Sequence, residues 1–182
     1  ALLDRLYEQH TAQGSSMAAY YAERAAGRSP NENWFDDRIH AFLRDKLVAL
    51  DRPKAEFCYM TCRALRALRI VEVGTSYGVS TLFLASAVRD NAASHEAKTE
   101  RPSVIATEHE AEKAKIARKA GAQHTILYRE EDFAKRVEEI TKGAKCAVVY
   151  DGVGKATFPA SLDCLRPFGM FASFGSASGG IQ

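Results

Sequence analysis

The sequence predicts an α/β fold: a Rossmann-like three-layer sandwich with a mostly parallel sheet of strand order 3-2-1-4-5 and an N-terminal helical extension. From about residue 69 onward, short β-branched runs alternate with amphipathic helical segments. Strands that alternate with helices require right-handed crossovers, and these give a parallel sheet covered on both faces. Before residue 69 the apolar residues recur only at three-to-four spacing, which indicates helices without strands.

The helical part is predicted to cover residues 1–68 as a cap, and a nucleotide-binding domain is predicted at residues 69–182. Gly27 and Pro30 interrupt the cap, and Asn31 or Asn33 can cap the helix that follows. Pro53 begins a further helix that runs to about residue 68.

The nucleotide-binding part is predicted to contain five strands, at 69–73, 104–107, 125–128, 147–150 and 170–174. The helices between them are predicted at 78–88, 111–120, 132–140 and 156–165. The stretch 90–101 has no apolar period and is predicted to be a surface loop. A sheet of this order binds its ligand at the carboxyl edge, where the order reverses between the first and fourth strands.

The composition is that of an ordinary soluble protein, with 46% hydrophobic and 26% charged residues among 182. A net charge of +2 gives no reason to expect nucleic acid or an anionic membrane as a partner. No signal peptide and no apolar run of membrane-spanning length is present, so a cytoplasmic location is expected. No zinc spacing accompanies the four cysteines, and no metal site is predicted. Buried thiols are the favoured interpretation, and a metal or redox pair at Cys58 and Cys62 is the alternative.

A glycine turn joins the first strand to the first crossover helix, and its backbone N–H groups are predicted to face a ligand. The predicted cofactor-binding residues of this turn are Glu72, Gly74, Thr75, Ser76 and Gly78. Ser76 and Val79 stand where a dinucleotide fingerprint has its second and third glycines, which weakens a pyrophosphate interpretation. The acidic Glu72 suits a cationic group such as the amino end of S-adenosylmethionine. The alternative is a turn that merely closes a βα unit.

Acidic residues follow the later strands. Glu108 is predicted to accept ribose hydroxyls and to disfavour the extra phosphate of NADP, or else to be a solvated member of an acidic cluster. Asp132 with Phe133 is predicted to hold adenine, or Asp132 only caps a helix. Asp151 is predicted at the cofactor, with a simple Asp-Gly turn as the alternative. No histidine is assigned to catalysis, and the catalytic residues stay unassigned.

Two families are resembled by different parts of the chain. The segments KAEFC at 54–58, RIVEVGTSYGVST at 69–81 and VIATEHE at 104–110 resemble class I S-adenosylmethionine-dependent O-methyltransferases. The segments AGAQH at 120–124, YREEDF at 128–133, VVYDGVG at 148–154 and SLDCLRP at 161–167 resemble the nucleotide-binding domain of zeta-crystallin-type NADPH:quinone oxidoreductases. The chain therefore resembles a hybrid, methyltransferase-like to about residue 110 and quinone-reductase-like after it.

The first resemblance implies a methyltransferase that uses S-adenosylmethionine and a small-molecule acceptor, with the acceptor near Tyr20, Tyr21 and Trp34. The second implies an NADPH-binding quinone oxidoreductase-like fragment, in which Tyr128 with Lys113 or Lys115 meets a nucleotide phosphate. A non-catalytic chimeric Rossmann-fold domain is the third hypothesis. The resemblance to a methyltransferase also implies that a sheet edge remains uncovered after the fifth strand, which favours a homodimer or aggregation.

Overall fold

The computed structural model describes residues 2–27, 36–94 and 101–181. It divides the chain into two compact units, Ala1–Ala49 and Leu50–Gln182. Helix α4 (Arg52–Ala64), which the sequence pattern groups with the predicted N-terminal cap, belongs to the second unit.

The described residues of the first unit include helices α1 (Leu2–Ala12), α2 (Gly14–Ala26) and α3 (Asp37–Leu43). The ring of Tyr20 in α2 stacks on the ring of Phe42 in α3, with 3.8 Å between the ring centroids. Asn31, Asn33 and Trp34, which carried predictions on caps and on the acceptor, lie outside the described residues.

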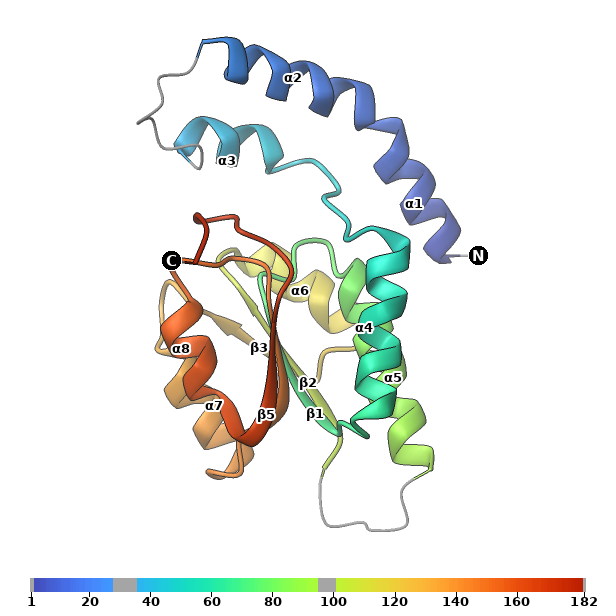
Figure 1. Ribbon diagram of the computed structural model, residues 1–182, viewed down its shortest axis with the longest axis vertical. Coiled ribbons are helices and arrows are strands. Elements are labelled where there is room, and N and C mark those ends of the chain that lie inside the picture. Colours follow the sequence, from blue (N-terminus) through green and yellow to red (C-terminus); the bar gives the residue numbers. More distant parts are fainter. Residues whose placement is uncertain (1, 28–35, 95–100, 182) are drawn as a thin grey trace. The chain divides into compact units, whose positions relative to one another are not determined.

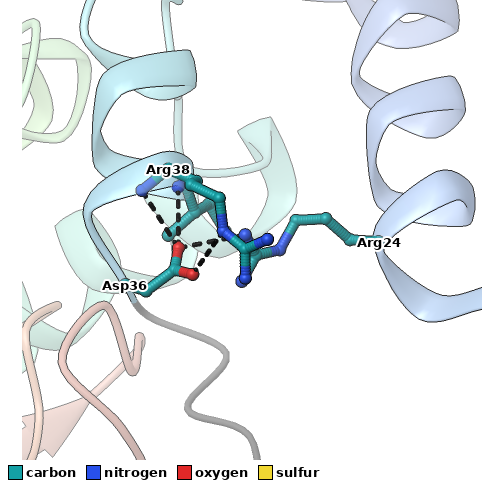
Figure 2. A network of polar contacts seen from close by, with 4 residues as sticks. Arg24, Asp36 and Arg38 are labelled. Carbon is teal, nitrogen blue, oxygen red and sulfur yellow. Dashed lines mark hydrogen bonds and ion pairs between the residues drawn. The ribbon is translucent and has the colours of Figure 1, made fainter. Parts of the chain in front are cut away.

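Asp36 caps α3 and also ties it to α2. Its carboxylate accepts the backbone N–H groups of Arg38 at 3.0 Å and Ile39 at 3.2 Å, which satisfies two amides of the first helical turn. The same carboxylate pairs with the Arg38 guanidinium at 2.8 Å and with that of Arg24 at 3.0 Å (Figure 2). Loss of water raises the pKa of this carboxyl, but the hydrogen bonds from Arg38 and Arg24 outweigh that effect and hold the pKa well below its usual range.

The second unit contains the predicted sheet. Its strands are β1 (Arg69–Val73), β2 (Ser103–Glu108), β3 (His124–Leu127), β4 (Cys146–Asp151) and β5 (Leu165–Ser173). They form one five-stranded sheet of order β3-β2-β1-β4-β5, and all neighbouring pairs are parallel. The predicted fold class and strand order are therefore confirmed. β1 is the central strand: Val73 lies opposite Thr107 of β2 and Asp151 of β4.

Two helical layers cover this sheet. Helices α4, α5 (Val79–Ala93) and α6 (Ala111–Lys119) lie on one face, and α7 (Phe133–Thr141) and α8 (Phe158–Asp163) lie on the other (Figure 1). Successive strand residues face opposite layers, so Ile70 joins the core under α4 and α5, whereas Val71 joins the core under α7 and α8. Residues 70–73 of β1 are all buried, as expected for a central parallel strand.

Two elements are longer than predicted. Helix α5 continues to Ala93, so residues 90–93 are helical and not part of a loop, because the buried Asn91 amide is used inside the fold. Strand β5 begins at Leu165, with an irregular register opposite Cys146 and Val148. Among the described residues, no helix is long and apolar enough to cross a membrane.

Candidate nucleotide site

The glycine turn after β1 is packed against its neighbours. Gly74 has a φ of +83°, and a Cβ built there would lie 2.7 Å from Cγ2 of Val153. Gly78 has a φ of +75°, and its Cβ would lie 2.9 Å from Cβ of Ala120. Both positions therefore need glycine for backbone conformation and for close packing. The N–H groups of Gly74 and Thr75 donate to the carbonyl of Thr107, at 3.0 and 3.4 Å.

Glu72 is fully buried directly before this turn. Its carboxylate accepts the hydroxyl of Ser80 and, at 2.6 Å, the hydroxyl of Thr81. Burial raises the pKa of Glu72 to about 7, and the two hydroxyl donors only partly oppose this effect. The predicted cofactor-binding acid thus holds the first turn of α5 against β1.

Glu108 ends β2 and reaches back to the turn. One of its oxygens accepts the N–H of Ser76, which has a φ of 52°, and the other accepts the N–H of His109 at 3.1 Å. The His109 ring lies between two acids, with Nδ1 at 3.3 Å from Glu108 and Nε2 at 3.3 Å from Glu110. The structure therefore brings Ser76 and Glu108 together, as two predicted site residues, through a direct hydrogen bond.

Asp132 and Phe133 follow β3. Asp132 is the N-cap of α7, and its carboxylate accepts the N–H of Lys135 at 3.1 Å. Phe133 is only 6% exposed and packs in the core with Ile126 and Val137. The alternative role of Asp132 as a helix cap is therefore observed directly, and the Phe133 ring is part of the core.

Asp151 ends β4 and is fully buried. Its carboxylate accepts the N–H groups of Val153 at 2.8 Å and Gly154 at 2.9 Å. It also accepts the hydroxyls of Thr157 at 2.8 Å and Ser161 at 2.6 Å. These donors come from the turn after β4 and from the start and middle of α8, so Asp151 organises that turn.

His109, Lys113 and Tyr128 form a further group at the carboxyl ends of β2 and β3, which we call the edge cluster. The Lys113 ammonium lies 5.7 Å from the centre of the Tyr77 ring and 3.5 Å from a Glu110 oxygen, and its side chain is 12% exposed. The rings of His109 and Tyr128 are 6.2 Å apart. Burial, together with the negative charge of Glu108, raises the pKa of Tyr128 to about 12, so the phenol stays protonated and can donate.

Lys115 differs from Lys113. It is 67% exposed and pairs with Glu112 at 2.6 Å, on the same helix. Of the two lysines that the sequence suggested, Lys113 is thus the one that lies near the glycine turn, over the ring of Tyr77.

The segment after β5 was not singled out from the sequence, although it lies at the same edge. The N–H of Ser178 donates to the carbonyl of Val153 at 2.7 Å, and the N–H of Lys155 donates to that of Gly179 at 3.0 Å. A Cβ on Gly175 would lie 2.5 Å from the carbonyl oxygen of Gly152. The signal that could have revealed this contact is the pairing of two glycine-rich turns, after β4 and after β5.

The cysteines are buried and reduced. Burial raises the pKa of Cys58 to about 11 and that of Cys62 to about 12, so both thiols stay protonated. The Cys62 sulfur lies 3.4 Å from the Tyr150 hydroxyl, inside the core. In the part of the chain that the structure describes, no three His, Cys, Asp or Glu side chains lie together as a metal site requires.

Comparisons with known proteins connect the later part of the chain to one family. Residues 95–182 match the family model described as zinc-binding dehydrogenase. The quinone oxidoreductase of Pseudomonas aeruginosa is 53% identical over 78 residues, which are 43% of this chain and 24% of the relative. The 2-haloacrylate reductase of a Burkholderia species is 57% identical over 76 residues, 42% of this chain and 23% of the relative. The chain thus spans about a quarter of the length of these curated relatives. The described residues show no cluster that would hold the zinc of the family description.

Solved structures give the same connection. The Escherichia coli quinone oxidoreductase complexed with NADPH aligns with a TM-score of 0.52 and 38% identity, over 63% of this chain and 32% of that chain. The structure of 2-haloacrylate reductase aligns with a TM-score of 0.59 and 33% identity, over 85% of this chain and 44% of that chain.

The predicted methyltransferase function, with S-adenosylmethionine as cofactor, is wrong. The relatives reported above are oxidoreductases, and nothing in the comparisons supports an O-methyltransferase part. The physical reason lies at Glu72, the acid on which that interpretation depended. Its carboxylate is fully buried and accepts hydrogen bonds from two hydroxyls of α5. The resemblance of the later segment to quinone oxidoreductases is supported.

Proposed function

We propose that the Leu50–Gln182 unit binds NADPH and serves as the nucleotide-binding part of an oxidoreductase of the quinone oxidoreductase kind. The match of residues 95–182 and the likeness to an NADPH complex support this proposal. Bound NADPH would supply a hydride for a small-molecule acceptor. Because the chain spans about a quarter of its curated relatives, the activity and the acceptor class are part of the proposal.

The observation that carries the proposal is the edge cluster. Lys113, in the first turn of α6, supplies a cation, and Tyr128, directly after β3, supplies a protonated phenol; both are donors of the kind that bind a phosphate. The carboxyl edge beside the central strand is also the place where open parallel sheets bind nucleotides.

Glu108 has a restraining role in this proposal. Its carboxylate already accepts the N–H of Ser76, one of the turn amides that a diphosphate would otherwise approach. The negative charge of this carboxylate repels a phosphate. The carboxylate oxygens also have further lone pairs that can accept a ribose hydroxyl. Asp132, Phe133 and Asp151 would act indirectly, by holding the loops that surround the nucleotide.

The test is a fluorescence titration of the full chain with NADPH, comparing two lysine variants of α6. Lys113→Ala removes the partly buried cation, and we expect an affinity about 10- to 100-fold lower, as for loss of one charged hydrogen bond. Lys115→Ala removes the same charge two residues away, at an exposed position, and serves as the matched control. Absence of NADPH binding by the unaltered chain, or equal losses in both variants, would contradict the proposal.

A further inference from the structure

A polar cavity lies at the opposite edge of the sheet from the glycine turn. Its volume is about 290 Å³, and it is lined by Arg63, Arg66, Asn91 and Ser94. The two arginines come from the end of α4 and the turn that leads into β1, and the other two residues come from the end of α5. The cavity therefore belongs to the amino edge of the sheet, away from the edge cluster.

Hydrogen bonds within the fold hold the walls of this cavity. The buried Asn91 amide donates to the carbonyls of Cys62 at 3.0 Å and Ala67 at 2.9 Å, which fixes the end of α4 against α5. The Ser94 hydroxyl donates to the carbonyl of Asp90 at 3.0 Å. The backbone of Arg66 has a φ of 49°, and its N–H donates to the carbonyl of Arg63 at 3.0 Å. The walls are thus held by hydrogen bonds within the chain.

The charge in the cavity is positive and not fully paired. Nη1 of Arg63 is buried and has no hydrogen-bond partner. The nearby acid, Asp90, is close enough to interact with Arg63, but its oxygens accept the Tyr59 hydroxyl at 2.8 Å and the Arg89 guanidinium at 3.1 Å. The carboxyl ends of α4 and α5 favour cations nearby, yet none of their carbonyl oxygens accepts a hydrogen bond from the buried Nη1. A buried guanidinium N–H without an acceptor is unfavourable, because it has lost its hydrogen bonds to water without replacement.

We propose that this cavity binds a phosphate group, either free or carried by a small phosphomonoester. Two guanidinium groups are the preferred partners of phosphate, because each can donate two parallel N–H bonds. The volume of about 290 Å³ is near the lower limit of small-molecule sites, about 300 Å³, and suits a phosphate with a short substituent. In this proposal the anion accepts hydrogen bonds from the guanidinium groups of Arg63 and Arg66, which line the cavity.

The test is isothermal titration of the full chain with inorganic phosphate at constant ionic strength, with chloride as the balancing anion. We expect saturable heat with phosphate, and an affinity at least about tenfold lower in Arg63→Gln. Arg136→Gln makes the same charge change on α7, on the other face of the sheet, and is expected to bind phosphate unchanged. A parallel titration with glycerol phosphate distinguishes a site for free phosphate from a site for a phosphomonoester. Glycerol phosphate that binds more tightly than inorganic phosphate identifies a phosphomonoester site.

Three results would overturn the proposal: heat no greater than with chloride, an equal loss in Arg136→Gln, or phosphate affinity unchanged in Arg63→Gln. Circular dichroism and thermal unfolding check that Arg63→Gln is folded. If it is not, Arg66→Gln carries the test, because the Arg66 side chain is exposed and tolerates truncation. NADPH affinity in the Arg63→Gln variant is expected to match the unaltered chain. A loss of NADPH affinity would be a fourth result against the proposal, because it would mean that the phosphate titration had measured binding at the carboxyl edge of the sheet.

Discussion

The glycine turn and the edge cluster lie at the same edge of the sheet but use their polar groups differently. The two acids beside the turn are bonded within the fold: Glu72 accepts two hydroxyls of α5, and Glu108 accepts an N–H of the turn. The edge cluster holds a cation and a protonated phenol beside the strand ends. The edge cluster also lies within residues 95–182, the span that matches the dehydrogenase family, whereas the turn lies before it. The contrast teaches that the acids beside the turn are used within the fold, and it is the reason why the proposed binding of a phosphate is placed at the edge cluster.

The largest effect on stability is expected from disturbing the contact between the glycine turn and residues 95–182, the span that matches the family model. In Gly74→Ala the new Cβ meets Val153 from the matched span, at 2.7 Å and at a φ of +83°. We expect the free energy of unfolding to fall by about 3 kcal/mol, from backbone strain plus overpacking. Chemical denaturation measures the loss.

Two further variants separate the causes of that loss. Gly143→Ala has a similar φ of +79° with nothing within 4 Å, so only about 1 kcal/mol of strain is expected. In the double variant Gly74→Ala with Val153→Ala, the clashing methyl is gone, so the two losses should be less than additive. Additive losses would show that the turn and the β4 loop are not in contact.

A second, somewhat smaller effect on stability is expected from the pH dependence of the buried Glu72 carboxyl. Its pKa of about 7 lies above the ordinary 4.5, so the folded state holds this proton more tightly than the unfolded chain. The carboxyl therefore contributes stability that is fully present below pH 4.5 and lost as the pH rises through 7.

Glu72→Gln cannot ionise and keeps this stability. We expect it to raise the free energy of unfolding at pH 8 by about 2–3 kcal/mol over the unaltered chain, and by little at pH 4.5. Urea unfolding at both pH values measures the difference. Glu112→Gln, at a residue 80% exposed, is the control and should show no such pH dependence. The same difference at both pH values would argue against a buried ionisable acid.

The smallest effect concerns Glu108, which connects the turn to the edge cluster. Glu108→Gln keeps an acceptor for the Ser76 N–H but removes the negative charge. We expect NADPH affinity to rise by about tenfold and NADH affinity to rise less, because NADPH carries one more phosphate. Parallel fluorescence titrations with the two nucleotides measure this. Weaker binding of both nucleotides would instead support ribose recognition by Glu108, the role predicted from the sequence.

The fold was predictable because the alternation of β-branched runs and amphipathic helices leaves few topologies open. The continuation of α5 beyond Val88 was not, since Asn91 looks like a loop residue until its amide meets the carbonyls of Cys62 and Ala67. Hydrogen bonds between residues more than twenty positions apart produce no local sequence pattern from which the end of a helix could be predicted.

The site was less predictable, for reasons visible at single residues. Residues 70–73 of β1 are all buried, so alternation cannot tell which strand side chains face a ligand, and the burial of Glu72 could not be read from the sequence. The spacing of Thr157 and Ser161 after Asp151 is a local sign that the hydroxyls can satisfy this carboxylate within its own turn. The choice of Lys113 over Lys115 depends on the Tyr77 ring, which only the three-dimensional structure brings near.

The central position of β1 has a consequence for any attempt to isolate the later span. β2 and β4 do not pair with each other; each pairs with β1. A polypeptide that began after residue 94 would keep the pairs β2–β3 and β4–β5 but would lack the strand that joins them. Each pair would then expose a row of unpaired backbone donors and acceptors, and such rows recruit foreign strands. Solubility of the later span thus depends on a strand that lies outside the matched residues.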